Sequence, residues 1–216
     1  HALFYGIDLE LDSCAHHAHV LWLRGYADQA RQVSDEAVAL ARHLSHPFSL
    51  AHSLSLAAML RQFCREVSAV SERAESAVEL AREQVFPLEA ARGMILRGWA
   101  RAQQGQIQEG LADVRQGLST GQEARARMLH PYYLAVLAEL LDTTGQVDEG
   151  LNVLNEALEI VDKTGERMYE AELYRLKGDM LLQPALGDEQ RAETSLRHAL
   201  DIARAQQAKA WELRTA

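Results

Sequence analysis

Cysteine is scarce in this sequence, with Cys14 and Cys64 the only two among 216 residues. They fall in different predicted helices, and free cysteine is among the most buried residue types, so we expect both in the core. Two such cysteines give no disulfide framework. This pattern is typical of a reducing compartment and predicts a cytoplasmic protein.

Long apolar runs and a basic leader are also missing. No run approaches the roughly 20 apolar residues that span a bilayer. The opening stretch, HALFYGIDLELD, lacks the basic region of a signal peptide. We therefore expect no membrane partner. Because the sequence opens on His1 rather than methionine, we expect a fragment of a longer protein.

Basic residues are fewer than acidic ones. The sequence has 22 Lys and Arg against 31 Asp and Glu, which gives a formal net charge of −9 at pH 7. Nucleic-acid binding needs a basic surface, so we expect no direct nucleic-acid partner. Hydrophobic residues make up 48% of the chain, which is enough to form a core.

Signatures of catalysis are lacking as well. The sequence has no G-x-x-x-x-G-K-[ST] loop to hold a phosphate. Its Ser and His residues are scattered, without the strained turn that presents a nucleophile. We therefore expect no enzyme, no catalytic residue and no cofactor.

What the sequence does contain is amphipathic helix along its whole length. In Ser34–Leu44 and in Val147–Val161, apolar residues recur at helical spacing. Helix-forming residue types dominate the composition. No segment keeps the period-two alternation of a strand, so no sheet is expected.

Small side chains recur with a period of 40 residues. Three series follow this period, with Ala192 and Ala199 displaced by two residues: Ala37, Ala77, Gly117, Ala157 and Ala199; Ala18, Ala58, Gly98, Ala138 and Gly178; Ala30, Val70, Gly110, Gly150 and Ala192. Such self-similarity is the signature of a solenoid. Small residues are expected where helices approach most closely.

Turn residues share this period. The expected breaks inside the helix pairs are Gly25, Arg65, Gly105, Gly145 and Gly187. Prolines 47, 87 and 131 stand where the next helix is expected to begin. The predicted units are residues 9–44, 47–84, 87–121, 130–164 and 167–207, with an incomplete sixth at 208–216. We expect one domain over residues 1–216.

The spacing of small residues within each unit resembles the tetratricopeptide pattern, W-x2-L-G-x2-Y…A-x3-F…P. With Gly178 at the eighth position, the eighth, twentieth and twenty-seventh places hold Ala or Gly in every unit except at Val70. The resemblance implies an all-α fold. It would be a right-handed α-solenoid of about five tetratricopeptide-like helix pairs.

A narrower resemblance rests on three segments, Gly145–Leu151, Ala171–Leu182 and Trp211–Ala216. They are similar to the C-terminal repeat region of large bacterial signalling ATPases. There an NTPase module is often accompanied by an adenylate or guanylate cyclase, or by a transcription regulator. The resemblance implies a regulatory domain. Its partner would be a protein or peptide, or the ATPase or cyclase part of the same polypeptide.

Histidines cluster at His16, His17 and His19. The i, i+3 spacing of His16 and His19 would let both reach one metal ion from one helix face. Further ligands could come from the histidines that follow, which are His43, His46 and His52. No third ligand follows with conventional spacing, so we expect no metal site.

In tetratricopeptide arrays, the second, fifth, ninth and twelfth positions of each unit line the concave groove. The candidate binding residues at these positions are His19, Trp22, Arg92, Trp99, Tyr132, Glu139 and Arg175. Aromatic and charged groups together suit a peptide or small ligand. The alternative is that Trp22 and Trp99 fill gaps between helices.

The sequence therefore predicts a non-catalytic protein–protein interaction domain that regulates a bacterial signalling protein. The alternative function is a sensor that binds a metabolite in the concave groove. An uncapped apolar face near Leu196–Ile202 also predicts a homodimer through the C-terminal helices.

Overall fold

The computed structural model describes residues 3–4, 7–124, 128–184 and 186–216. Its contacts divide the chain into two compact units, His1–Ala126 and Arg127–Ala216, here called unit 1 and unit 2. The all-α prediction of five helix pairs is confirmed within the described residues. The single domain and the right-handed sense of the whole array stay predictions.

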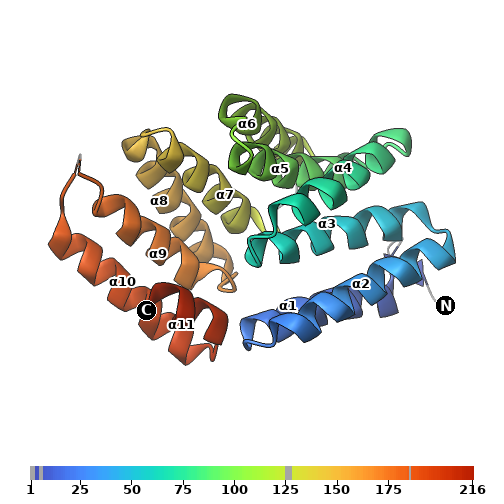
Figure 1. Cartoon of the computed structure of the whole chain (residues 1–216), viewed down its shortest axis with the longest axis horizontal. Coiled ribbons are helices and arrows are strands. Elements are labelled where there is room, and N and C mark those ends of the chain that lie inside the picture. Colours follow the sequence, from blue (N-terminus) through green and yellow to red (C-terminus); the bar gives the residue numbers. More distant parts are fainter. Residues whose placement is uncertain (1–2, 5–6, 125–127, 185) are drawn as a thin grey trace. The chain divides into compact units, whose positions relative to one another are not determined.

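Unit 1 contains three helix pairs that follow a short hairpin (Figure 1). Its elements are β1 (Leu3–Phe4), β2 (Ile7–Asp8), α1 (Leu9–Leu23), α2 (Ala27–Leu44), α3 (Pro47–Phe63), α4 (Val67–Glu83), α5 (Pro87–Gln103) and α6 (Ile107–Glu123). The two strands pair antiparallel over two residues each. The sequence predicted no strand, so this hairpin corrects that expectation.

Unit 2 contains two helix pairs and one further helix. Its helices are α7 (His130–Thr143), α8 (Val147–Thr164), α9 (Glu170–Leu181), α10 (Glu189–Ala205) and α11 (Lys209–Thr215). Within the unit, α9 packs against α7, α8, α10 and α11. The first helix of a pair therefore lies between its neighbours.

The turns inside the pairs adopt the predicted left-handed backbone. Gly25, Gly105 and Gly145 have φ of 92°, 91° and 75°, and Arg65 has a φ of 59° in the second pair. A second set of left-handed residues, which the sequence did not predict, lies at the ends of second helices. Its members are Ser45, Val85, Gly165 and Gln207.

The small residues bring helices into close contact. A Cβ added to Gly98 of α5 would lie 2.6 Å from the carbonyl oxygen of Gly110 on α6. A Cβ added to Gly117 would lie 2.7 Å from the carbonyl oxygen of Ala91. These distances are too short for a Cβ atom to be accommodated. The repeated small residues therefore mark the points at which helices cross.

The two helices of a pair differ in burial. Every residue from Ala51 to Phe63 in α3 is buried, whereas α2 buries one face through small residues such as Ala30, Ala37 and Ala41. First helices therefore carry the core of each unit, and second helices cover it. Among the described residues, no helix is both long enough and apolar enough to cross a membrane.

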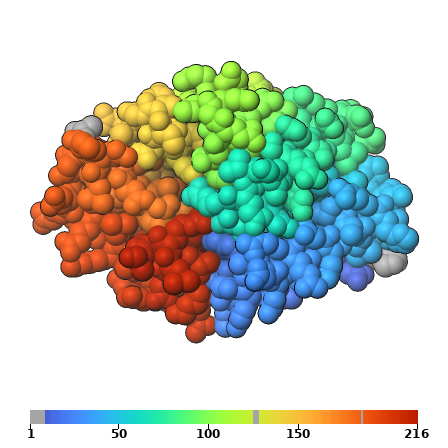
Figure 2. Space-filling model, in the orientation of Figure 1, coloured from blue at the N-terminus to red at the C-terminus, as the bar shows by residue number. Residues whose placement is uncertain are grey.

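The short helix α11 lies directly against α10 (Figure 2). Its Trp211 is fully buried and packs edge-on against Tyr169, with ring centroids 5.1 Å apart. The start of a sixth repeat thus covers part of the fifth. Leu213 of α11 remains 77% exposed. The predicted homodimer stays a prediction.

Candidate functional site

A chain of polar contacts joins the first helices of unit 1. His52 of α3 lies between Asp12 of α1 and Arg92 of α5, and the three residues are spaced by 40. The Nε2 atom of His52 is 3.1 Å from Asp12 Oδ1, and its Nδ1 atom is 3.1 Å from Arg92. Residues at the same position of three successive repeats are therefore joined by contacts.

Glu89 supplies the negative charge at the buried end of this chain. Its side chain is 0% exposed, and its Oε1 atom is 3.1 Å from His52 Nδ1 and 2.9 Å from Arg92. Burial alone would raise the pKa of Glu89. The hydrogen bond with His52 and the charge of Arg92 outweigh burial and hold this pKa below its usual value.

His19, a candidate binding residue, is buried. Its Nδ1 atom is 2.9 Å from the carbonyl oxygen of Ala15, and its ring packs edge-on against Phe63. Burial lowers the pKa of His19 to about 4, so this imidazole is neutral near pH 7. His16 points elsewhere, toward Asp12 at 3.4 Å. His16 and His19, whose spacing would let them reach one ion, therefore turn to different partners.

The two candidate tryptophans of unit 1 also contribute to packing. Trp22 contacts the ring of Phe63 at a centroid distance of 4.9 Å. Trp99 is 0% exposed, and the Arg65 guanidinium lies 5.7 Å from its ring centroid. This burial favours the alternative that both rings fill gaps between helices. A binding role for them stays a prediction.

Unit 2 contains a row of aromatic side chains. Tyr132 packs edge-on against Tyr169, and Tyr169 packs edge-on against Trp211. All three side chains are buried. Tyr132, the candidate groove residue of α7, thus belongs to a stack that ties α7 to α11.

Carboxylates gather on the first helices of unit 2. The predicted Glu139 of α7 lies one turn before Asp142, and the predicted Arg175 of α9 lies one turn before Asp179. Arg175 donates to Glu172 at 2.7 and 2.9 Å and also contacts Asp179. We call Glu139, Asp142, Glu172, Arg175 and Asp179 the acidic cluster.

The negative charges of the acidic cluster act on one another. Burial raises the pKa of Asp142, and the charges of Asp179 and Glu139 raise it further. Burial and the charge of Glu172 also raise the pKa of Asp179, although Arg175 opposes this shift. Like charges are therefore held close together, and a cation would lower their repulsion.

The sequence analysis did not select some of these residues. Asp12, His52, Asp142 and Asp179 occupy groove positions of the repeat, so the 40-residue spacing was the available signal. Glu89 lies three residues before Arg92, at a position that carries no such signal.

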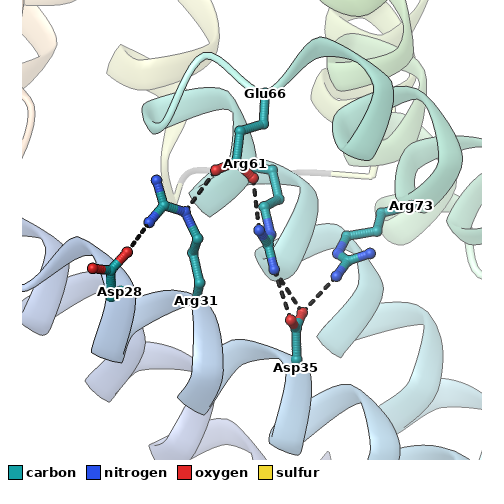
Figure 3. Close-up of polar contacts among 6 residues, drawn as sticks. All are labelled: Asp28, Arg31, Asp35, Arg61, Glu66 and Arg73. Carbon is teal, nitrogen blue, oxygen red and sulfur yellow. Dashed lines mark hydrogen bonds and ion pairs between the residues drawn. The ribbon is translucent and has the colours of Figure 1, made fainter.

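A second polar network joins α2, α3 and α4 (Figure 3). Arg61 donates to Asp35 at 2.9 and 2.7 Å and to Glu66 at 2.6 Å, and Arg73 shares Asp35. Burial would raise the pKa of Asp35, but hydrogen bonds from Arg61 and Arg73 outweigh it and lower this pKa. Every charged group in Figure 3 has a partner within the network, so these residues act as cross-links between repeats.

A cavity of about 490 Å³ lies between α9 and α10 in unit 2. Its walls combine aromatic, basic and hydroxyl groups, including Tyr174, Lys177, Arg191, Ser195 and His198. The Tyr174 and His198 rings meet edge-on at 4.4 Å. This volume is within the range of small-molecule sites.

No protein-family model matches the chain. A curated relative, an uncharacterized protein of Rhizobium meliloti (strain 1021), is 27% identical over 208 residues. This match covers 96% of the chain but only 20% of the relative. The chain therefore spans about one fifth of the length of that protein.

Solved structures of helical-repeat proteins share the fold. PlcR of Bacillus thuringiensis, in complex with the peptide PapR7 and DNA, matches with a TM-score of 0.77 at 13% identity. This match covers 96% of the chain and 74% of PlcR. The TPR-like repeats of a putative kinesin light chain from Podosopora anserina match with a TM-score of 0.54 at 23% identity, covering 93% of the chain and 96% of that structure. The protein thus has a tetratricopeptide-like fold.

Proposed function

We propose that this chain is a non-catalytic interaction domain that regulates a bacterial signalling protein by binding a basic protein segment. The acidic cluster of unit 2 carries the proposal. Its carboxylates lie on first helices, at positions that the repeat assigns to the groove, and burial together with the repulsion of neighbouring negative charges raises the pKa values of Asp142 and Asp179. A Lys- or Arg-rich segment would relieve that repulsion.

The chemistry of the cluster supports a peptide more than a metabolite. Arg175 and Glu172 form a fixed ion pair, and Arg214 of α11 holds the same carboxylate at 3.0 Å. Asp142 accepts from Gln183 at 3.3 Å. Leu182, at the end of α9, adds an exposed apolar side chain. Charged side chains beside an exposed apolar side chain are a common basis for peptide recognition.

The fold and the charge of the chain also support a regulatory role. PlcR, which has the same fold, was solved with a bound peptide. The net charge of −9 suits a basic protein partner better than nucleic acid. We place the partner in the cytoplasm, either as a separate protein or as the ATPase or cyclase part of the same polypeptide.

Peptide binding tests the proposal. Fluorescence anisotropy with labelled lysine-rich and glutamate-rich peptides of equal length should show binding of the lysine-rich peptide alone. The double substitution Asp142→Asn and Asp179→Asn should weaken that binding about tenfold, because it removes two of the charges that face the peptide. Added salt should weaken binding to the wild type more than to the variant.

A matched control separates the cluster from net charge. Asp148→Asn with Asp162→Asn removes the same two charges from exposed positions on α8. This control should bind as the wild type does. Equal losses in both double variants, or no preference for the lysine-rich peptide, would contradict the proposal.

A metabolite sensor is the second candidate, favoured by the cavity between α9 and α10. The aromatic residues that line this cavity are Tyr174 and His198. The groove residues Trp22 and Trp99, which the sequence predicted for a sensor, are not among its lining residues. A ligand there should raise the melting temperature of the wild type and not of a Tyr174→Ala variant.

A further inference from the structure

Asp12, His16 and His52 converge in unit 1. Each residue offers one ligand atom, and these atoms all lie within 4.8 Å of one another. Asp12 and His16 are i, i+4 neighbours on α1, and His52 reaches them from α3. The sequence shows no third ligand at conventional spacing for this histidine cluster. The fold supplies Asp12, which the spacing did not reveal, and His52, one of the three later histidines that the sequence offered as a further ligand.

The distances between these atoms suit a small dication. Asp12 Oδ1 is 3.1 Å from His52 Nε2 and 3.4 Å from His16 Nε2. Tetrahedral zinc with bonds of about 2.0–2.1 Å separates its ligands by roughly 3.3–3.4 Å. The ligand atoms of His16 and His52 lie within 4.8 Å of each other, so a bound ion would draw this pair closer together.

A buried carboxylate stands behind one of these ligands. Metal-bound histidines almost always offer their second ring nitrogen to a carboxylate or carbonyl, which fixes the ring. His52 has this arrangement, with Nδ1 at 3.1 Å from the buried Glu89 and Nε2 toward Asp12. Arg92 holds Glu89 in place at 2.9 Å.

We propose that Asp12, His16 and His52 bind a zinc-class dication, with Glu89 as the residue that orients His52. Two imidazoles and one carboxylate favour Zn²⁺ or its neighbours over Mg²⁺ and Ca²⁺, which prefer oxygen ligands alone. Three protein ligands leave a fourth position for water or for a donor atom from a partner. The site belongs to unit 1 and is independent of the acidic cluster.

Metal titration of two single variants tests this site. The chain, without a histidine tag and stripped with a chelator, is titrated with Zn²⁺ in a calorimeter. The wild type should bind one equivalent, and Zn²⁺ should raise its melting temperature. His16 is largely exposed, with a side chain 51% accessible, so His16→Ala should fold normally. It should bind Zn²⁺ about tenfold or more weakly.

His17 provides the matched control. It is an exposed histidine next to His16 and lies outside the group of three. His17→Ala should bind Zn²⁺ as the wild type does. The proposal is overturned if the wild type binds no Zn²⁺, if His16→Ala binds it unchanged, or if both variants lose affinity equally. In those cases Asp12 and His52 form only a polar contact between repeats.

Discussion

At the scale of single residues, burial decides what His19 does. Its ring lies between Phe63 and the backbone of α1, where a charged imidazolium would lose its hydration. The pKa is therefore lowered from 6.5 to about 4. Between these values the unfolded chain binds a proton that the folded chain does not. The contribution of the neutral His19 ring to the free energy of unfolding is therefore fully present above about pH 6.5, and it is lost as the pH decreases toward 4.

The substitution His19→Gln tests this effect. Glutamine keeps an N–H donor for the carbonyl of Ala15 and does not titrate. Between pH 7 and pH 5, the wild type should lose about 2 kcal/mol more of its unfolding free energy than the variant does. Chemical denaturation at both pH values measures the difference. Parallel losses in the two proteins would show that His19 is not buried as a neutral ring.

At the scale of helices, crossings depend on small side chains. Gly98 of α5 and Gly110 of α6 face each other so closely that each would clash with the carbonyl oxygen of the other if it carried a Cβ. Because backbone atoms form this contact, side-chain rotation cannot relieve it. The distance between α5 and α6 is therefore fixed by these two glycines.

We expect Gly98→Ala to destabilise unit 1 by about 1–3 kcal/mol. Gly121→Ala, also in the α5–α6 pair, is the control. A Cβ there would meet only Ala91 at 3.9 Å, which is an ordinary contact. It should be neutral or stabilising by up to about 1 kcal/mol, because alanine favours helix. Thermal unfolding compares the two, and similar melting temperatures would count against the crossing.

Much of the helical architecture could be predicted from the sequence because the small residues mark the crossings directly. The left-handed turn at Val85 could not, since a β-branched residue with a φ of 59° runs against local preference. The candidate site was harder to predict. Groove positions were assigned from the repeat, but burial decides that Trp99 packs inside while Asp179 reaches the surface. Only tertiary contacts bring Glu89 to His52.

At the scale of the whole molecule, the repeat places equivalent positions in contact. Asp12, His52 and Arg92 are equivalent and meet in unit 1, and in unit 2 Tyr169 meets Trp211, its equivalent after the two-residue shift, as well as Tyr132. These rows hold successive first helices in register. The carboxylates of α7 and α9 lie outside these rows, and we propose that they face a partner.

We propose above all that the acidic cluster on α7 and α9 receives a basic segment. Nuclear magnetic resonance tests it most directly, with an isotope-labelled chain titrated with a lysine-rich peptide. We expect the largest amide shifts around Glu139, Asp142 and Asp179, and we expect the amides of α2 and α4 to remain unchanged. Shifts confined to the second helices, or no shifts at all, would contradict it.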